Sequence, residues 1–129
     1  MLNSGHLLEA VAINKAARDI RLDPKIFAYS VGPSTPEFTG VLGKDADYVF
    51  SGSQWRSQVK YRPSFYLDTP QYVATYRKKF KSDEDPDYHV AESTAACLAL
   101  HKAIETAGSL QPERVRDALA TLELICVRR

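Results

Sequence analysis

The sequence has little of what marks several large classes of protein. It contains only two cysteines, Cys97 and Cys126, which are too few for a disulfide-stabilised scaffold. Its 17 basic and 16 acidic residues leave a net charge of +1, so no strong attraction to nucleic acid or to a membrane surface is expected. No apolar run approaches the roughly 20 residues of a membrane-spanning helix. The 129 residues, 44% hydrophobic and 26% charged, instead have the composition of one globular domain.

Common nucleotide-binding and hydrolase motifs are also missing. The chain has no Gly-x-x-x-x-Gly-Lys-Ser/Thr loop and no Gly-x-Gly-x-x-Gly loop for phosphates. It has no Gly-x-Ser-x-Gly nucleophile elbow, because Ser51-Gly52-Ser53 lacks the required order. A Ser/His/Asp triad is a spatial arrangement that motif searches do not test, so this alternative stays open. We expect no enzymatic activity and no cofactor.

One pair of residues has the spacing of metal ligands. His89 and Glu92 lie three residues apart in a predicted helix, but a site needs a third ligand, and His101 lies about 120° further round that helix. A hydrogen-bonded structural pair is therefore expected, and no metal. Cys97, in an Ala/Leu-rich helical run, is expected to be a small buried hydrophobe. A disulfide between Cys97 and Cys126 depends on a distance that the sequence does not give.

The first half of the chain alternates between helical and strand patterns. His6–Ile20 predicts a helix whose broad apolar face packs on a sheet, with a polar side formed by Glu9, Asn14, Lys15, Arg18 and Asp19. Ile26–Val31 predicts a buried strand that Gly32 and Pro33 end. A short helix follows to Leu42, with either Ser34 or Thr35 as its N-cap, and a second strand covers residues 48–53. This order predicts a βαβ unit with parallel strands.

The start of the chain leaves that unit without an expected neighbour. Only four residues precede Gly5, so no strand is expected before the first helix. The helix and the strand Ile26–Val31 would then have open edges, which favour homodimers or aggregation. The first six residues also lack a basic segment followed by an apolar run, so no secretory signal peptide is expected there.

The second half predicts helices after an irregular segment. Residues 54–68 mix aromatic and basic side chains, a combination that can bind single-stranded nucleic acid. The near-neutral charge favours a linker whose aromatics pack on neighbouring elements, so no nucleic-acid partner is expected. A helix from Thr69 to Lys81 repeats the earlier Thr-Pro start, and two more cover residues 88–106 and about 112–122.

Short motifs occur in a fairly specific order along the chain. They are Tyr29-Ser30-Val31-Gly32-Pro33, Thr35-Pro36-Glu37-Phe38, Gly43-Lys44-Asp45-Ala46, Ser53-Gln54-Trp55, Thr69-Pro70-Gln71-Tyr72, Tyr76-Arg77-Lys78-Lys79-Phe80, Pro86-Asp87-Tyr88-His89 and Pro112-Glu113-Arg114-Val115-Arg116-Asp117-Ala118-Leu119. This order resembles the type I periplasmic solute-binding proteins of branched-chain amino-acid and amide ABC importers, which are leucine-binding-protein-like. The resemblance covers residues 5–122 of a chain much shorter than those proteins, so a C-terminal fragment is expected.

The resemblance implies an α/β fold that is part of the type I periplasmic-binding-protein fold. Residues 1–55 would match the later part of the second α/β lobe, and residues 56–68 the segment that crosses back. Residues 69–122 would be returning helices of the first lobe, with 123–129 as a tail. The family holds a small solute between its lobes and delivers it to an ABC permease, in the periplasm or at the cell surface. A sensory receptor domain of the same fold, or an interaction fragment that binds no solute, are the alternatives.

The resemblance also implies ligand-binding residues at two loops. His6 falls near a position where the family often has a side chain that contacts the solute. Ser30, Val31, Gly32 and Pro33 fall where amino-acid binders place an acidic group for the α-ammonium. No carboxylate stands at Val31-Gly32-Pro33, which favours an amide, a carboxylate or another small polar solute over an ordinary amino acid.

Overall fold

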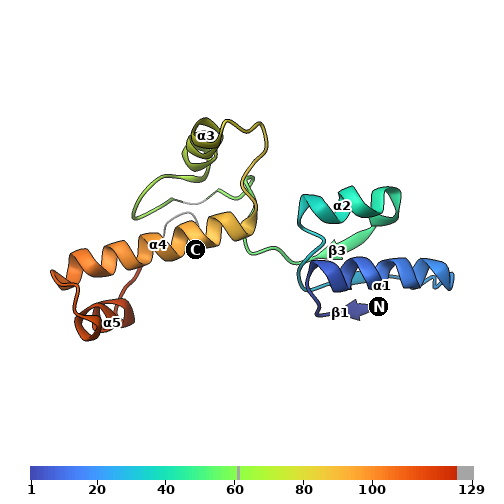
Figure 1. Cartoon of the computed structure of the whole chain (residues 1–129), viewed down its shortest axis with the longest axis horizontal. Helices are drawn as coiled ribbons and strands as arrows, with labels where there is room; N and C mark the ends of the chain where they lie inside the picture. Colours follow the sequence, from blue (N-terminus) through green and yellow to red (C-terminus); the bar gives the residue numbers. More distant parts are fainter. Residues whose placement is uncertain (61, 125–129) are drawn as a thin grey trace. The chain divides into compact units, whose positions relative to one another are not determined.

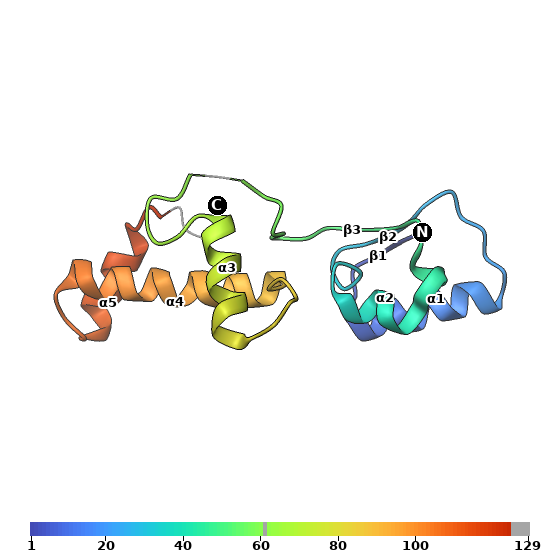
Figure 2. The ribbon, with the colours of Figure 1, turned by 90° about the horizontal axis from the view of Figure 1, so that it is seen from above.

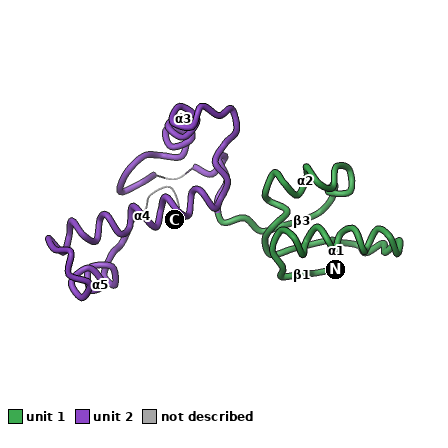
Figure 3. Tube along the Cα trace, in the orientation of Figure 1, with its two compact units in different colours: residues 1–54 green, residues 55–129 purple. Residues whose placement is uncertain are grey.

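The computed structural model describes residues 1–60 and 62–124 and divides the chain into two compact units. Unit 1 is Met1–Gln54 and unit 2 is Trp55–Arg129 (Figure 3). Unit 1 contains three strands and two α-helices, and unit 2 contains three α-helices among its described residues (Figure 1). The predicted α/β class is therefore confirmed.

The sheet of unit 1 is parallel and has the strand order β1-β2-β3. Its strands are β1 (Leu2–Asn3), β2 (Phe27–Tyr29) and β3 (Val49–Ser51), so the predicted βαβ unit is confirmed. The expectation of no strand before the first helix is wrong. Two residues suffice for β1, because the N–H groups of Ala28 and Ser30 donate to the carbonyls of Met1 and Asn3, each at 2.9 Å. Strand β2 is consequently central, and it has no open edge.

Two helices cover one face of this sheet. They are α1 (Leu7–Asp19) and α2 (Pro36–Leu42), which ends in the short 3-10 helix η1 (Gly43–Ala46), and both lie on the same side of the strands (Figure 2). Phe27 and Tyr29 point from β2 into this layer and pack with Phe38 of α2 in one apolar core. Phe38 is 1% exposed, and its ring centroid lies 6.2 Å from that of Tyr29.

The buried side of α1 differs from the predicted one. Ala10, Asn14 and Ala17 are buried, whereas Leu8 and Ile20 are 80% and 73% exposed. Asn14 was expected on the polar side, yet it is 0% exposed. Only the row of residues at i, i+4 and i+7, which is Ala10, Asn14 and Ala17, packs against the sheet. The small alanine side chains in this row let the helix approach the sheet closely. A wide apolar stripe alone could not identify that row.

The other face of the sheet has no helix of unit 1 against it. The register pairs Leu2 with Ala28 and Ala28 with Phe50, so these three side chains form a row across the sheet. Leu2 is 84% exposed and Phe50 is 60% exposed. Ile26, two residues before Ala28, was expected to be buried but is 52% exposed, because it belongs to this open face.

Unit 2 is built from α3 (Thr69–Phe80), α4 (Tyr88–Ala107) and α5 (Pro112–Ala120). As expected for residues 54–68, their described part contains no helix or strand. The aromatics Trp55 and Phe65 pack on neighbours as expected, whereas Tyr66 is 47% exposed. Trp55 is 2% exposed and meets Tyr72 edge-on, with 5.9 Å between ring centroids. The ring of Phe65 lies beside Lys102, whose Nζ is 5.3 Å from the ring centroid.

The expectation that Cys97 is buried is wrong, because its side chain is exposed. Tyr88 and Ala91 on α4 are buried against α3 and Trp55. Six residues separate Ala91 from Cys97, which places them about 120° apart around the helix. Cys126, the other cysteine of the disulfide that the sequence left open, lies outside the described residues.

Helix α3 begins with a capping box that the Thr-Pro pattern did not predict. The N-cap is Asp68, not Thr69: its Oδ1 accepts from the N–H of Gln71 at 2.9 Å, and the Gln71 side chain accepts from the N–H of Asp68 at 3.3 Å. We expect Asp68→Ala to lower the free energy of unfolding by about 0.5–2 kcal/mol. Urea denaturation followed by circular dichroism measures this loss. Asp68→Asn keeps the acceptor and should restore most of it; an equal loss in both variants would contradict the capping role.

Candidate functional site

The carboxyl ends of the three parallel strands meet at one edge of unit 1. The N–H of Ser30 donates to the carbonyl of Asn3 at 2.9 Å, which joins the loop after β2 to the end of β1. The N–H of Gly52 donates to the carbonyl of Tyr29 at 3.3 Å, which joins the end of β3 to β2. In open α/β sheets small ligands bind beyond this edge. We define the strand-end edge as residues 3–6, 30–35 and 51–53.

Gly32 brings the loop after β2 against the start of α1. Its φ of +99° is a conformation that side chains disfavour. A Cβ built on Gly32 would lie 3.1 Å from both the Cα and the N of Leu7, and 3.2 Å from the carbonyl carbon of His6. Only glycine fits here without strain, because the neighbouring atoms are helix backbone. The two loops that the sequence singled out therefore touch at Gly32 and His6.

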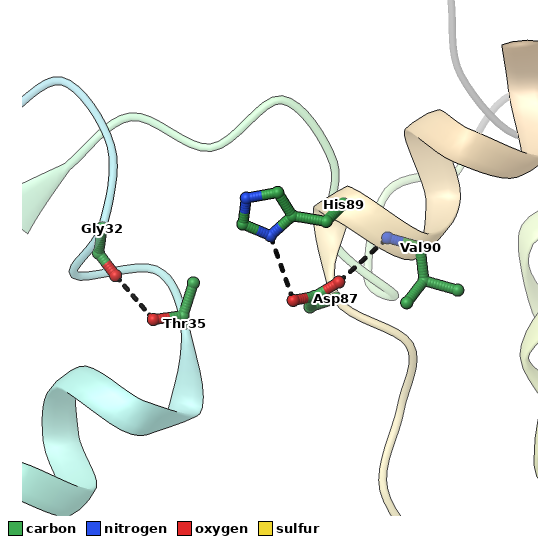
Figure 4. Close-up of polar contacts among 5 residues, drawn as sticks. All are labelled: Gly32, Thr35, Asp87, His89 and Val90. Atoms are coloured by element: carbon green, nitrogen blue, oxygen red, sulfur yellow. Dashed lines mark hydrogen bonds and ion pairs between the residues drawn. The ribbon is translucent and has the colours of Figure 1, made fainter. Parts of the chain in front are cut away.

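Thr35 closes the turn between this loop and α2. Its N–H donates to the carbonyl of Gly32 at 3.0 Å. Its Oγ1 donates to the same carbonyl at 2.8 Å (Figure 4). Of the two predicted N-caps, Thr35 is the observed one, with Pro36 as the first residue of the helix. The Thr35 hydroxyl accepts no hydrogen bond from the first turn of α2, because it points back along the chain and donates to the carbonyl of Gly32. These two hydrogen bonds to one carbonyl oxygen fix the shape of the Gly32–Thr35 turn.

The five residues that the sequence singled out differ in exposure. His6 and Ser30 are exposed, so their side chains are accessible to a solute. Val31 and Pro33 are half-buried, and Gly32 is buried. Of these five residues, His6 and Ser30 thus offer one imidazole and one hydroxyl beside a rigid turn. These groups can donate and accept hydrogen bonds, and none of the five carries a fixed charge.

The structure adds residues that sequence reasoning missed. Asn3 Oδ1 accepts from the N–H of Gly5 at 2.6 Å and so shapes the loop that leads to His6. Ser51 ends β3, and its hydroxyl donates to the carbonyl of Gly52 at 2.8 Å. A Cβ built on Gly5 would lie 2.7 Å from the Cβ of Glu9, so a carboxylate-bearing side chain starts beside this loop. Asn3 was missed because no strand was expected to end there, although an Asn-x-Gly sequence is a turn signal.

A buried polar pair lies behind the edge, in the core of unit 1. Tyr29 immediately precedes Ser30 and is 4% exposed, with Asn14 of α1 as its polar neighbour. Burial raises the pKa of the Tyr29 phenol, while Asn14 and the charge of Arg18 act in the opposite direction. Tyr29 is therefore neutral at ordinary pH. The buried Tyr29 side chain holds β2 in the core beneath the strand-end edge, and its neutral phenol adds no charge to that edge.

The second cluster that the sequence raised, around His89, has a structural role. Asp87 caps α4: its Oδ1 accepts from the N–H of Val90 at 3.0 Å, and its Oδ2 lies 3.2 Å from His89 Nδ1 (Figure 4). His89 is thus paired with Asp87, a partner that the expected pairing of His89 with Glu92 did not include. Among residues 1–60 and 62–124, no three His, Cys, Asp or Glu side chains are grouped as metal ligands.

Two comparisons with known proteins bear on this arrangement. A family model described as "Periplasmic binding protein" matches residues 8–126. The crystal structure of a leucine-binding protein, LivK, from Thermotoga maritima is similar to this chain, with a TM-score of 0.74 and 20% sequence identity. The match covers 92% of this chain and 32% of that chain, so this chain spans about a third of its length. In the part of the chain that the structure describes, no helix has the length and apolarity needed to cross a bilayer.

Proposed function

Because this chain belongs to the periplasmic binding protein family, we propose that it is a type I, leucine-binding-protein-like member and supplies part of a binding site for a small polar solute. In this proposal unit 1 is the later part of the second lobe. Residues 56–68 cross back, and residues 69–122 are returning helices of the first lobe. The fold shared with LivK over 92% of this chain supports that assignment.

The observation that carries the proposal is the strand-end edge. Three parallel strands end together, and Gly32 locks the loop after β2 onto the start of α1. A loop held in this way is already in one conformation before a solute arrives, which lowers the entropic cost of binding. Of the five residues that the sequence singled out, His6 and Ser30 are the exposed polar ones that this rigid frame presents.

The solute class follows from which groups line the edge. An α-ammonium group is best held by a carboxylate, and Val31, Gly32 and Pro33 provide none. A neutral amide or a carboxylate needs hydrogen-bond donors and acceptors, which an imidazole and a hydroxyl supply. We propose an amino acid, an amide or a carboxylate as the solute, with the last two favoured.

The wider role follows from the family. We propose that the chain acts in the periplasm or at the cell surface, as the solute-binding component of an ABC importer with a permease as its partner. Binding needs no covalent chemistry, so no catalytic residue is assigned. A receptor domain of the same fold would use the same edge, and an interaction fragment would bind no solute.

Thermal-shift screening of the 129-residue chain with amino acids, amides and carboxylates tests the proposal. We expect a rise in melting temperature with at least one solute, confirmed by titration calorimetry. His6→Ala and Ser30→Ala should each weaken that binding by about 5–30-fold, because each removes a hydrogen bond. His101→Ala, an exposed histidine of α4 paired with Glu105, should leave it unchanged. Absence of any shift, or equal weakening by His101→Ala, would overturn the proposal.

A further inference from the structure

The core of unit 1 contains two polar side chains at the place where α1 packs on the sheet. Asn14 of α1 is 0% exposed and Tyr29 of β2 is 4% exposed. Asn14 lies between Ala10 and Ala17 on the buried side of the helix, and both alanines belong to the same core cluster as Tyr29. Asn14 is also the hydrogen-bonding side chain beside the Tyr29 phenol. An amide and a hydroxyl therefore meet inside an apolar core.

Both side chains need a hydrogen-bond partner in this position. Among residues 1–60 and 62–124, no group meets the full geometry of a hydrogen bond with Asn14 Oδ1, Asn14 Nδ2 or the Tyr29 hydroxyl. A buried polar group without a partner destabilises a fold, and nearly all such groups in native proteins are satisfied. Because the whole surface of Asn14 is covered, further protein packed on the outside of unit 1 cannot supply its partner.

We propose that the Asn14 amide and the Tyr29 hydroxyl form a hydrogen bond that fixes which face of α1 packs on β2. The two groups are complementary, because the amide can donate through Nδ2 or accept through Oδ1, and a hydroxyl can do either. The apolar pattern of α1 does not choose the face, since apolar side chains such as Leu8 also lie outside the buried row. A rotated helix would leave the phenol unpaired against an apolar side chain. Buried polar groups select one packing arrangement in this way in other helical proteins.

The same pair sets the relative position of two residues of the strand-end edge. His6 is the N-cap of α1, and Ser30 directly follows Tyr29 at the end of β2. Because the bond joins this helix to this strand, it holds His6 and Ser30 at a constant separation. Asn14 is thus a positioning residue that lies outside the edge itself. The use of this positioning in solute binding rests on the proposed function, whereas the hydrogen bond does not.

A double-mutant cycle tests the bond without any solute. Hydrogen exchange at the slowest amides of α1 and β2 measures the opening of unit 1. Tyr29→Phe should speed this exchange about fivefold in the native chain, as expected for the loss of one hydrogen bond, and should not speed it in a chain that carries Asn14→Ala. Alanine is a good helix former, so Asn14→Ala keeps α1 intact. Tyr88→Phe, at a buried tyrosine of unit 2, is the matched control and should have the same effect in both backgrounds. Equal acceleration by Tyr29→Phe in both backgrounds overturns the proposal.

Nuclear magnetic resonance of the Asn14→Ala chain supplies two further readouts. The pKa of the Tyr29 phenol should rise, because the amide that stabilises its charged form is gone. The imidazole signals of His6 and the amide signal of Ser30 should shift, whereas the imidazole signals of His101 in unit 2 should stay in place. An unchanged Tyr29 pKa overturns the bond, and unchanged His6 and Ser30 signals overturn the positioning role. Neither readout uses a solute, so a failure of the proposed function would leave both results standing.

Discussion

Gly32→Ala is expected to lower the free energy of unfolding by about 2–3 kcal/mol, although it adds only one methyl group. Two costs combine at this position. The backbone of Gly32 has a φ of +99°, which an alanine adopts only with strain. Its new Cβ would also press against the N and Cα of Leu7 at 3.1 Å, and helix backbone cannot move aside cheaply. Chemical denaturation followed by circular dichroism measures the loss.

Gly40→Ala is the matched control for this prediction. Gly40 lies inside α2, and a Cβ built on it meets no atom within 4 Å. Alanine favours a helix interior over glycine, so this variant should be more stable than the native chain by about 0.5–1 kcal/mol. The same chemical change thus has opposite signs at two positions. If both variants lie within about 0.5 kcal/mol of the native chain, Gly32 is not the close contact described above.

Phe38→Ala is expected to lower the free energy of unfolding by about 3–5 kcal/mol, a larger loss than that expected for Gly32→Ala. Phe38 is 1% exposed and packs between α2 and the sheet, where its ring contacts that of Tyr29. Truncation leaves a cavity in a small core that has few other large side chains to fill it. Small domains are stable by only about 5–15 kcal/mol, so unit 1 would be close to unfolding.

Hydrogen exchange at the amides of β2 localises the effect, because Phe27 and Tyr29 flank the site of the cavity and belong to the same core. Phe50→Ala, in strand β3 of the same sheet, provides the comparison. Phe50 is 60% exposed, so its truncation should cost at most about 1 kcal/mol. Similar losses for the two phenylalanines would contradict the assignment of Phe38 to the core.

Local sequence signals predicted the elements of this fold well. Pro36 and Gly43 delimit α2, and Gly108 caps α4 in a left-handed conformation, as their backbone preferences require. The errors share a physical cause. Asn14, Cys97 and the strand Leu2–Asn3 depend on which surface meets which partner, and that is decided by packing between segments distant in the sequence.

The candidate site shows the same division. Gly32 and Pro33 could be read from the sequence as the end of a strand, because neither residue continues a ladder easily. The contact of Gly32 with His6 and Leu7 could not, because the two loops are distant in the sequence and meet only through the fold. Asn3 was missed for a related reason: its role requires a strand that only pairing with Ala28 and Tyr29 creates.

The burial of Trp55 gives the molecule a built-in optical probe. It is the only tryptophan of the chain, and it lies in the core of unit 2 against Tyr72. The fluorescence emission maximum of Trp55 should lie at short wavelength while that core is folded. It should move to longer wavelength when the core unfolds and water reaches the indole ring. Unit 1 contains no tryptophan, so it contributes nothing to this signal. Comparing the emission with a backbone signal would show whether the two units melt together, with no label attached.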